Sequence, residues 1–164
     1  MKWLGKNIVF AMFAMLMMMT TCMAAGPSDG EIPEADMALG GITLGASESY
    51  VRSIYGEPAD VSYDSNGGDG RFKICQYGSS LFVKIAQGSV IEVKSTANNG
   101  LKTPQGFTVG MPLSKVEKYY GNKGYASTEN GKKTRRYQAN WYKFIAYQAD
   151  KKGNIESIHL YRII

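Results

Sequence analysis

The sequence predicts an α+β fold made of two tandem units, in each of which a helix packs on an antiparallel β-meander. An internal repeat is the first indication: residues 41–56 align with residues 106–121, with seven identities in 16 positions at an offset of 65 residues. In addition, each copy of this motif is followed by runs that alternate apolar and polar residues, as β-strands do. The chain has 164 residues and only two cysteines, so its stability must come from an apolar core.

The N-terminal segment, residues 1–24, is predicted to be a signal peptide. Lys2 and Lys6 precede an apolar run that ends at Met19, which is too short to span a bilayer as a mature helix. Cleavage near Ala24 would release a free periplasmic or secreted protein with no membrane span. Processing at Cys22 is the alternative, and would leave a lipid-bearing cysteine that tethers the protein to a membrane.

Residues 25–40 carry four acidic residues, no basic residue and two prolines. Such a composition is unfavourable for burying a face, so we predict a flexible acidic linker. The first α+β repeat then covers residues 41–98 and the second covers residues 99–164. Because a unit of about 60 residues is marginal by itself, we expect the two repeats to pack as one compact unit.

Within each repeat a short strand leads to a helix. Ser47 is a suitable N-cap for the first helix, and Pro112 is placed where the first turn of the second tolerates proline. Gly56 and Gly121 end the helices, because glycine readily adopts the left-handed backbone found there. The predicted apolar faces are Val51, Ile54 and Tyr55 in the first helix and Val116, Tyr119 and Tyr120 in the second.

After each helix the apolar period changes to two. The predicted strands are 59–63, 71–77, 81–87 and 90–95 in the first repeat and 125–129, 134–139, 142–149 and 155–163 in the second. In the last strands we expect Trp141, Phe144, Ile155 and Ile158 to face inward.

The string from Gly41 to Pro58, a short strand, a capped helix and a Gly-x-Pro ending, resembles a motif of small bacterial envelope lipoproteins of the BamE (SmpA/OmlA) type. The tandem arrangement is similar to that of the β-lactamase inhibitor protein superfamily. The likeness covers about 18 residues closely, and the second copy lacks the proline. It implies a role in binding another protein in the cell envelope, and it transfers no binding residue.

Residues suited to catalysis are scarce. His159 is the single histidine and lies in a predicted strand, and Cys75 occupies a strand-like run that favours burial. Asp64, Asn66 and Asp69 faintly resemble a calcium loop, but their spacing is wrong and the closing glutamate is absent. We therefore predict a non-enzymatic protein with no catalytic residue, no metal site and no cofactor.

Charge and aromatic content distinguish the second repeat. Residues 99–164 contain 12 Lys/Arg and four Asp/Glu, whereas residues 41–98 contain five and six. The chain has 11 tyrosines, and aromatic residues beside arginine are common anchors of protein interfaces. The predicted partner-binding residues are Lys132, Lys133, Arg135, Arg136, Tyr137, Trp141, Tyr142 and Tyr147.

Two functions are consistent with these features. The first is an exported protein that contacts another envelope or secreted protein through its sheet and loop surface. The alternative is an envelope-associated structural factor that adheres by charge to anionic lipid or wall polymer. Nucleic acid is not an expected partner, because the protein is predicted to be exported.

Overall fold

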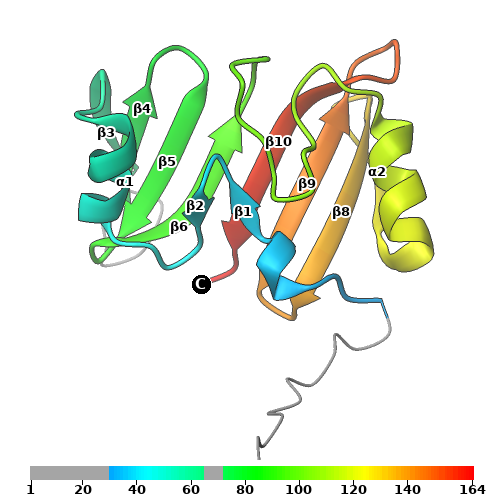
Figure 1. Ribbon diagram of the computed structural model, residues 1–164, viewed down its shortest axis with the longest axis horizontal. Helices are drawn as coiled ribbons and strands as arrows, with labels where there is room; N and C mark the ends of the chain where they lie inside the picture. Colours follow the sequence, from blue (N-terminus) through cyan, green and yellow to red (C-terminus); the bar gives the residue numbers. More distant parts are fainter. Residues whose placement is uncertain (1–29, 65–71) are drawn as a thin grey trace, which may run out of the picture.

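An antiparallel sheet of eight strands forms the centre of the molecule (Figure 1). The computed structural model describes residues 30–64 and 72–164. The strands are β3 (Asp60–Asp64), β4 (Phe72–Tyr77), β5 (Leu81–Ala86), β6 (Ser89–Ser95), β7 (Tyr125–Glu129), β8 (Lys132–Asn140), β9 (Lys143–Ala149) and β10 (Ile155–Arg162). Their order across the sheet is β3-β4-β5-β6-β10-β9-β8-β7, so the two halves join where β6 pairs with β10.

Two α-helices, α1 (Glu48–Tyr55) and α2 (Leu113–Tyr120), each precede four strands. Their bounds lie 65 residues apart, as the aligned motifs predict. The side chain of Ser47 caps α1 by accepting a hydrogen bond from the Tyr50 amide at 3.1 Å. Gly56 and Gly121 end the helices with φ of 75° and 61°, which confirms their predicted role.

The predicted helix faces are only partly correct. Val51 and Val116 are fully buried, but Ile54 is 45% exposed and Tyr119 is 61% exposed. Each helix lies near an outer end of the sheet (Figure 1). Ile54 lies beside Gly41, and the Tyr119 ring lies 5.6 Å from that of Phe107, so these two side chains border loops of the covering layer and stay partly open to solvent.

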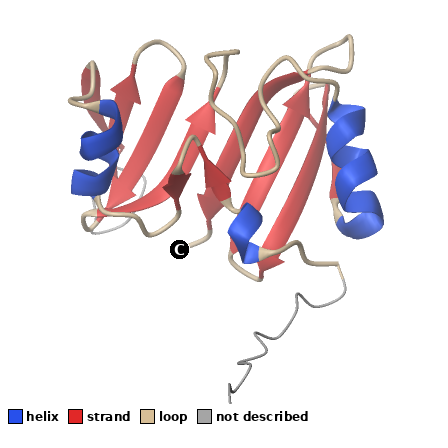
Figure 2. Cartoon of the chain, viewed as in Figure 1, coloured by secondary structure: helices blue, strands red, loops and turns tan. Residues whose placement is uncertain are grey.

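One face of the sheet is covered and the other is open. The helices lie on the same face as a small hairpin of β1 (Ala38–Leu39) and β2 (Ile42–Thr43), together with the 3-10 helix η1 (Glu34–Asp36) (Figure 2). A second 3-10 helix, η2 (Gly121–Lys123), follows α2. A single apolar core between this layer and the sheet includes Val51, Val83 and Val93 from the first half and Val116, Ile145 and Leu160 from the second. Among the described residues, no element covers the opposite face.

The described part of the predicted linker is instead built into the fold. Ile32, Met37 and Leu39 are at most 3% exposed, and the Ile32 amide donates a hydrogen bond to the Gln138 carbonyl at 2.8 Å. β7 pairs only with residues 132–136 of β8, so the later part of β8 has an edge that this segment occupies. The flexible-linker prediction is therefore wrong for residues 31–39. Residues 1–29, which include the predicted signal peptide and Cys22, lie outside the described residues.

Candidate functional site

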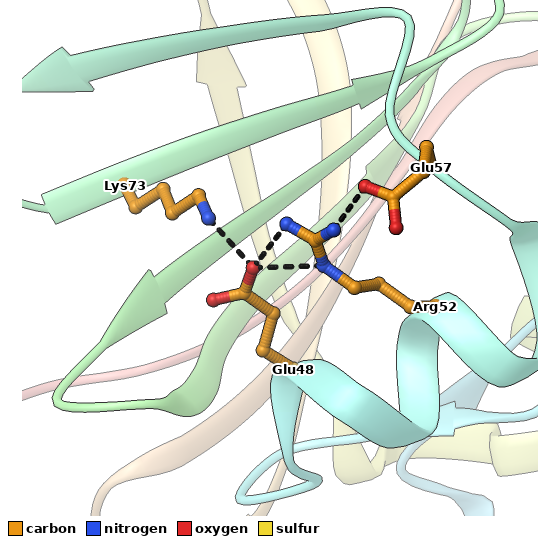
Figure 3. Close-up of polar contacts among 4 residues, drawn as sticks. All are labelled: Glu48, Arg52, Glu57 and Lys73. Atoms are coloured by element: carbon orange, nitrogen blue, oxygen red, sulfur yellow. Dashed lines mark hydrogen bonds and ion pairs between the residues drawn. The ribbon is translucent and has the colours of Figure 1, made fainter.

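Charged residues hold α1 against β4 (Figure 3). Glu48 Oε1 lies 2.6 Å from Lys73 Nζ and 2.9 Å from Arg52 Nη2, and Arg52 also pairs with Glu57. The hydrogen bond from Lys73 lowers the pKa of the Glu48 carboxyl, and the same bond raises the pKa of Lys73. Because these charges neutralise one another, the cluster connects a helix to the sheet and offers no free acid or base.

Cys75 and His159 lie on opposite faces of the sheet. Cys75 is fully buried in the core, where desolvation raises the pKa of its thiol and disfavours the reactive thiolate. His159 is on the open face, with Nε2 2.9 Å from Glu92 Oε1. Burial opposes ionisation of Glu92, but the close approach of His159 outweighs it, so the pKa of Glu92 is lowered. A cysteine–histidine pair is therefore not formed by these two residues.

The faint calcium motif can be examined at one position only. Asp64 Oδ2 forms an ion pair with Lys84 Nζ at 3.0 Å. Asn66 and Asp69 lie outside the described residues. Within residues 30–64 and 72–164, no group of three or more histidines, cysteines or acidic residues is arranged to hold a metal. In the same ranges, no helix has both the length and the apolar character needed to cross a bilayer.

Two of the predicted partner-binding residues, Tyr137 and Tyr147, are fully buried behind α2. The Tyr137 ring lies 4.6 Å from that of Tyr120, and the Tyr147 ring lies 6.0 Å from that of Phe107. Burial raises the pKa of Tyr137 to about 12 and also raises the pKa of Tyr147. Both tyrosines belong to the core, so their assignment to a binding surface is corrected.

The remaining predicted residues are distributed between the two ends of β8. At its start Lys132 pairs with Glu156, while Lys133 and Arg135 both pair with Glu117 of α2. Trp141 and Tyr142 lie just after its end. Trp141 was expected to face inward, but it is 79% exposed. At about 3.3 Å per residue, Lys132 and Trp141 are roughly 30 Å apart. The predicted residues therefore do not form one surface.

A different cluster crosses the open face of the sheet. We call Tyr125, Arg136, Phe144 and Tyr161 the open-face band, because they come from the adjacent strands β7, β8, β9 and β10. The Arg136 guanidinium lies 5.7 Å from the Tyr125 ring centre and 5.6 Å from that of Phe144. The Phe144 and Tyr161 rings stack at 5.5 Å. Arg136 was predicted to bind a partner and is the one predicted residue in this band.

The sequence prediction missed the other three members. Phe144 was expected in the core with Ile155 and Ile158; those two isoleucines are in the core, but Phe144 is on the open face, although only 8% exposed. The signal that could have found the band is the alternation along each strand, which separates Phe144 from its buried neighbour Ile145. Placing Phe144 beside Arg136 and Tyr161 also requires the register between strands, which one sequence does not reveal.

A shallow pocket lies at the edge of the hairpin layer. Its volume is about 260 Å³, and its lining consists of Glu34, Met37, Thr43, Leu44 and Lys143. Small-molecule sites usually measure about 300–1,000 Å³ and bury most of their ligand. Glu34 and Lys143 also form an ion pair with each other. The pocket is therefore a weaker candidate for binding than the open face.

The chain matches no protein-family model and no curated protein. It is similar in fold to a cysteine-rich secretory protein from Staphylococcus aureus, at 13% identity and a TM-score of 0.54, over 82% of this chain and 49% of that one. An uncharacterised protein, yfeY from Escherichia coli, is similar over 80% of this chain and 99% of that one, at 13% identity and a TM-score of 0.50.

An extracellular protein with an SCP domain from Bacillus anthracis is also similar, at 10% identity and a TM-score of 0.49, over 73% of this chain and 44% of that one. The chain thus spans less than half the length of this protein and of the staphylococcal one. Two of these three proteins are described as extracellular or secretory. At such low identity the likeness concerns the fold alone.

These matches correct the family assignment made from residues 41–58. The similar structures with a TM-score of 0.50 or more are of a secretory protein and of YfeY, and no BamE or β-lactamase inhibitor family model matches the chain. The motif encodes a turn, a capped helix and a glycine ending. These features are local and occur in unrelated folds, so they do not determine how the strands assemble.

Proposed function

We propose that the protein is exported and binds another exported or envelope protein through the open face of its sheet. The observation that carries this proposal is the open-face band, a row of aromatic rings and one exposed arginine across four adjacent strands. Arginine and aromatic residues are over-represented at the energetic centres of protein interfaces. The partner would lie on the rings of the band and pair with the Arg136 guanidinium.

Export is supported by the predicted signal peptide, residues 1–24, and by the likeness of the fold to proteins described as extracellular or secretory. The processed product is periplasmic or secreted, or alternatively tethered through Cys22. The proposal is non-enzymatic, because the thiol of Cys75 is buried and His159 is engaged by Glu92.

We further infer that the two halves arose by duplication of a unit with one helix and four strands. The support is the set of seven identities in 16 aligned positions, together with the same order of elements in each half. The 65-residue offset relates both ends of α1 to both ends of α2. The unit boundary at residues 98 and 99 stays a prediction.

Adhesion by charge to anionic lipid or wall polymer is the weaker alternative. It would use the basic end of the sheet, which contains Lys132, Lys133, Lys151 and Lys152. Lys132 and Lys133 are already paired with Glu156 and Glu117. This neutralisation reduces the field that would attract an anionic polymer.

A site-specific photocrosslinker tests the proposed protein partner in cells that export the protein. The aromatic crosslinking residue replaces Tyr125 of the band, which is 53% exposed. The matched control replaces Tyr119, which is 61% exposed but lies on α2, across the sheet from the band. We expect a discrete adduct with another protein at position 125 and none of that mass at position 119.

The yield of the adduct at position 125 should also fall in the Arg136→Ala variant, since this change removes the cation that contacts Tyr125 and Phe144. Identical adducts at positions 119 and 125, or none at position 125, would contradict the open face as the binding surface.

A further inference from the structure

Three exposed apolar side chains and the half-buried Tyr142 gather at one end of the sheet. Trp141 is 79% exposed in the turn between β8 and β9, and Ile163 and Ile164, which follow β10, are 58% and 75% exposed. The Ile163 amide donates a hydrogen bond to the Tyr142 carbonyl at 2.9 Å, which joins the two segments. The Trp141 and Tyr142 ring centres are 5.0 Å apart. We call Trp141, Tyr142, Ile163 and Ile164 the apolar tip.

The chain enters the described fold at this same end. Glu31 forms a bridge with Gln138, three residues before Trp141, so Gly30 lies near the tip. In Figure 1 the start of the described chain, the β8–β9 turn and the C-terminus all lie at the lower end of the sheet. The Lys-rich turns between β7 and β8 and between β9 and β10 lie at the upper end.

The tip is therefore close in sequence to the segment predicted to meet a membrane. Seven residues lie between Cys22 and Gly30, so eight Cα–Cα steps join them. Even fully extended, a chain of this length reaches only about 28 Å. If Cys22 carries a lipid, the end of the domain that faces the bilayer is the end that carries the tip.

The side chains of the tip suit the boundary between lipid and water. Tryptophan and tyrosine concentrate at that boundary, where a ring can sit among lipid chains while its polar atom meets the headgroups. Lys143 Nζ lies 5.6 Å from the Tyr142 ring centre, and Lys143 pairs with Glu34. Arg162 is opposite Lys143 in the sheet. Long basic side chains at such a position extend their charges toward headgroups.

We propose that the apolar tip inserts into the interfacial region of a lipid bilayer and orients the domain on it. Insertion is driven by the apolar side chains, because the lysine beside them is already paired with a carboxylate. It therefore needs no anionic lipid and persists at high salt, unlike adhesion through the basic end. It also leaves the open-face band accessible, so it does not depend on the proposed protein partner.

Trp141 is a natural reporter of this insertion. The full chain has two tryptophans, so the Trp3→Phe variant leaves Trp141 as the single fluorophore. This full-length variant is reconstituted into neutral phosphatidylcholine vesicles at low and high salt. We expect the Trp141 emission to shift to shorter wavelength when the vesicles are added. Brominated phosphatidylcholine should quench this emission, and both effects should be equally large at the two salt concentrations.

The matched control carries its single tryptophan at the opposite edge of the sheet, in the variant Trp3→Phe, Trp141→Phe, Tyr63→Trp. Tyr63 of β3 is 62% exposed. The tryptophan at position 63 should stay exposed to water, and brominated lipid should not quench its emission. If Trp141 in the first variant is quenched by aqueous acrylamide and not by brominated lipid, or if its lipid contact disappears at high salt, the proposed insertion is wrong.

Discussion

The two halves of the molecule use the same order of elements but fasten their helices in different ways. In the first half only Val51 of α1 is buried, and the Glu48–Lys73 ion pair connects the helix to β4. In the second half Leu113, Val116 and Tyr120 of α2 are buried, and the Tyr120 ring packs on Phe107 and Tyr137. Similar topology therefore does not imply similar energetics: α1 is attached at the surface and α2 is part of the core.

The buried hydroxyl of Tyr120 contacts a carboxylate of the N-terminal segment, whereas the hydroxyl of its counterpart Tyr55 in α1 donates a hydrogen bond to the Gly40 carbonyl. The Tyr120 hydroxyl donates a hydrogen bond to Asp36 Oδ2 at 3.0 Å, and Gln105 Nε2 donates to Asp36 Oδ1. Burial and the neighbouring Asp36 raise the pKa of Tyr120, which keeps the hydroxyl protonated. The N-terminal segment is thus held by α2 as well as by β8, so stability should be concentrated in the second half.

Replacing the helix tyrosines tests this difference most directly. Tyr120→Ala should lower the free energy of unfolding by about 3–5 kcal/mol, the range for large buried side chains. Tyr55 of α1 is half-buried, so Tyr55→Ala should cost clearly less. Denaturant titration at equilibrium measures both changes. Because one core spans both halves, the wild-type protein should unfold in one cooperative step. Equal losses of unfolding free energy in the two variants would contradict the proposed difference between α1 and α2.

Gly124 offers a second way to disturb the core of the second half. A Cβ at this position would lie 2.4 Å from Cε1 of Tyr137, and the φ of −90° is compatible with any residue. Gly124→Ala therefore acts through steric overlap alone and should cost about 1–3 kcal/mol. The exposed Ser127→Ala change on β7 is the control and should stay within about 0.5 kcal/mol of wild type. A neutral Gly124→Ala variant would mean that the Tyr137 ring is free to move.

The contact between α2 and the N-terminal segment should have an intermediate effect. Asp36→Ala removes the nearer acceptor of the buried Tyr120 hydroxyl and leaves it only Gln105 Oε1, at 3.3 Å, which should cost about 1–3 kcal/mol. Hydrogen exchange of the Ile32 amide should accelerate, since the segment loses one attachment. Asp60→Ala removes an exposed carboxylate from β3, at the opposite edge of the sheet, and serves as the control. Unchanged exchange at Ile32 in the Asp36 variant would show that this contact does not hold the segment.

Local signals in the sequence predicted the elements well. Alternation predicted all eight strands to within two residues at their ends, and the caps at Ser47, Gly56 and Gly121 predicted the helix limits. These features depend on neighbours in the chain, which is why a single sequence contains them.

Features that depend on distant parts of the chain were not predicted. The acidic composition of residues 25–40 suggested a linker, yet Ile32 pairs beside Gln138, more than 100 residues away. Trp141 and Phe144 were both expected inward, although positions three apart cannot share a face of one strand. The turn after β8 interrupts the alternation and exposes Trp141. The open-face band likewise depends on the register of four strands.

The smallest expected effect concerns the ion pairs of the two helices. Glu117 pairs with Lys133 and Arg135, both on β8, whereas one of the two partners of Glu48 is Arg52 on its own helix. Glu117→Gln should therefore destabilise the fold more than Glu48→Gln, each by no more than about 1 kcal/mol. Added salt should reduce both effects.

The pH dependence gives the sign of this contribution. The ion pairs lower the pKa of Glu48 and Glu117 below the ordinary value of 4.5. A carboxyl with a lowered folded-state pKa stabilises the protein above its unfolded-state pKa, and this stabilisation is lost as the pH falls through the folded-state value. Urea titrations at about pH 7 and about pH 3 should therefore show a smaller acid-induced loss for Glu117→Gln than for wild type. Glu129→Gln on exposed β7 is the control, and an acid response of Glu117→Gln equal to that of wild type would mean that α2 is held by its apolar side alone.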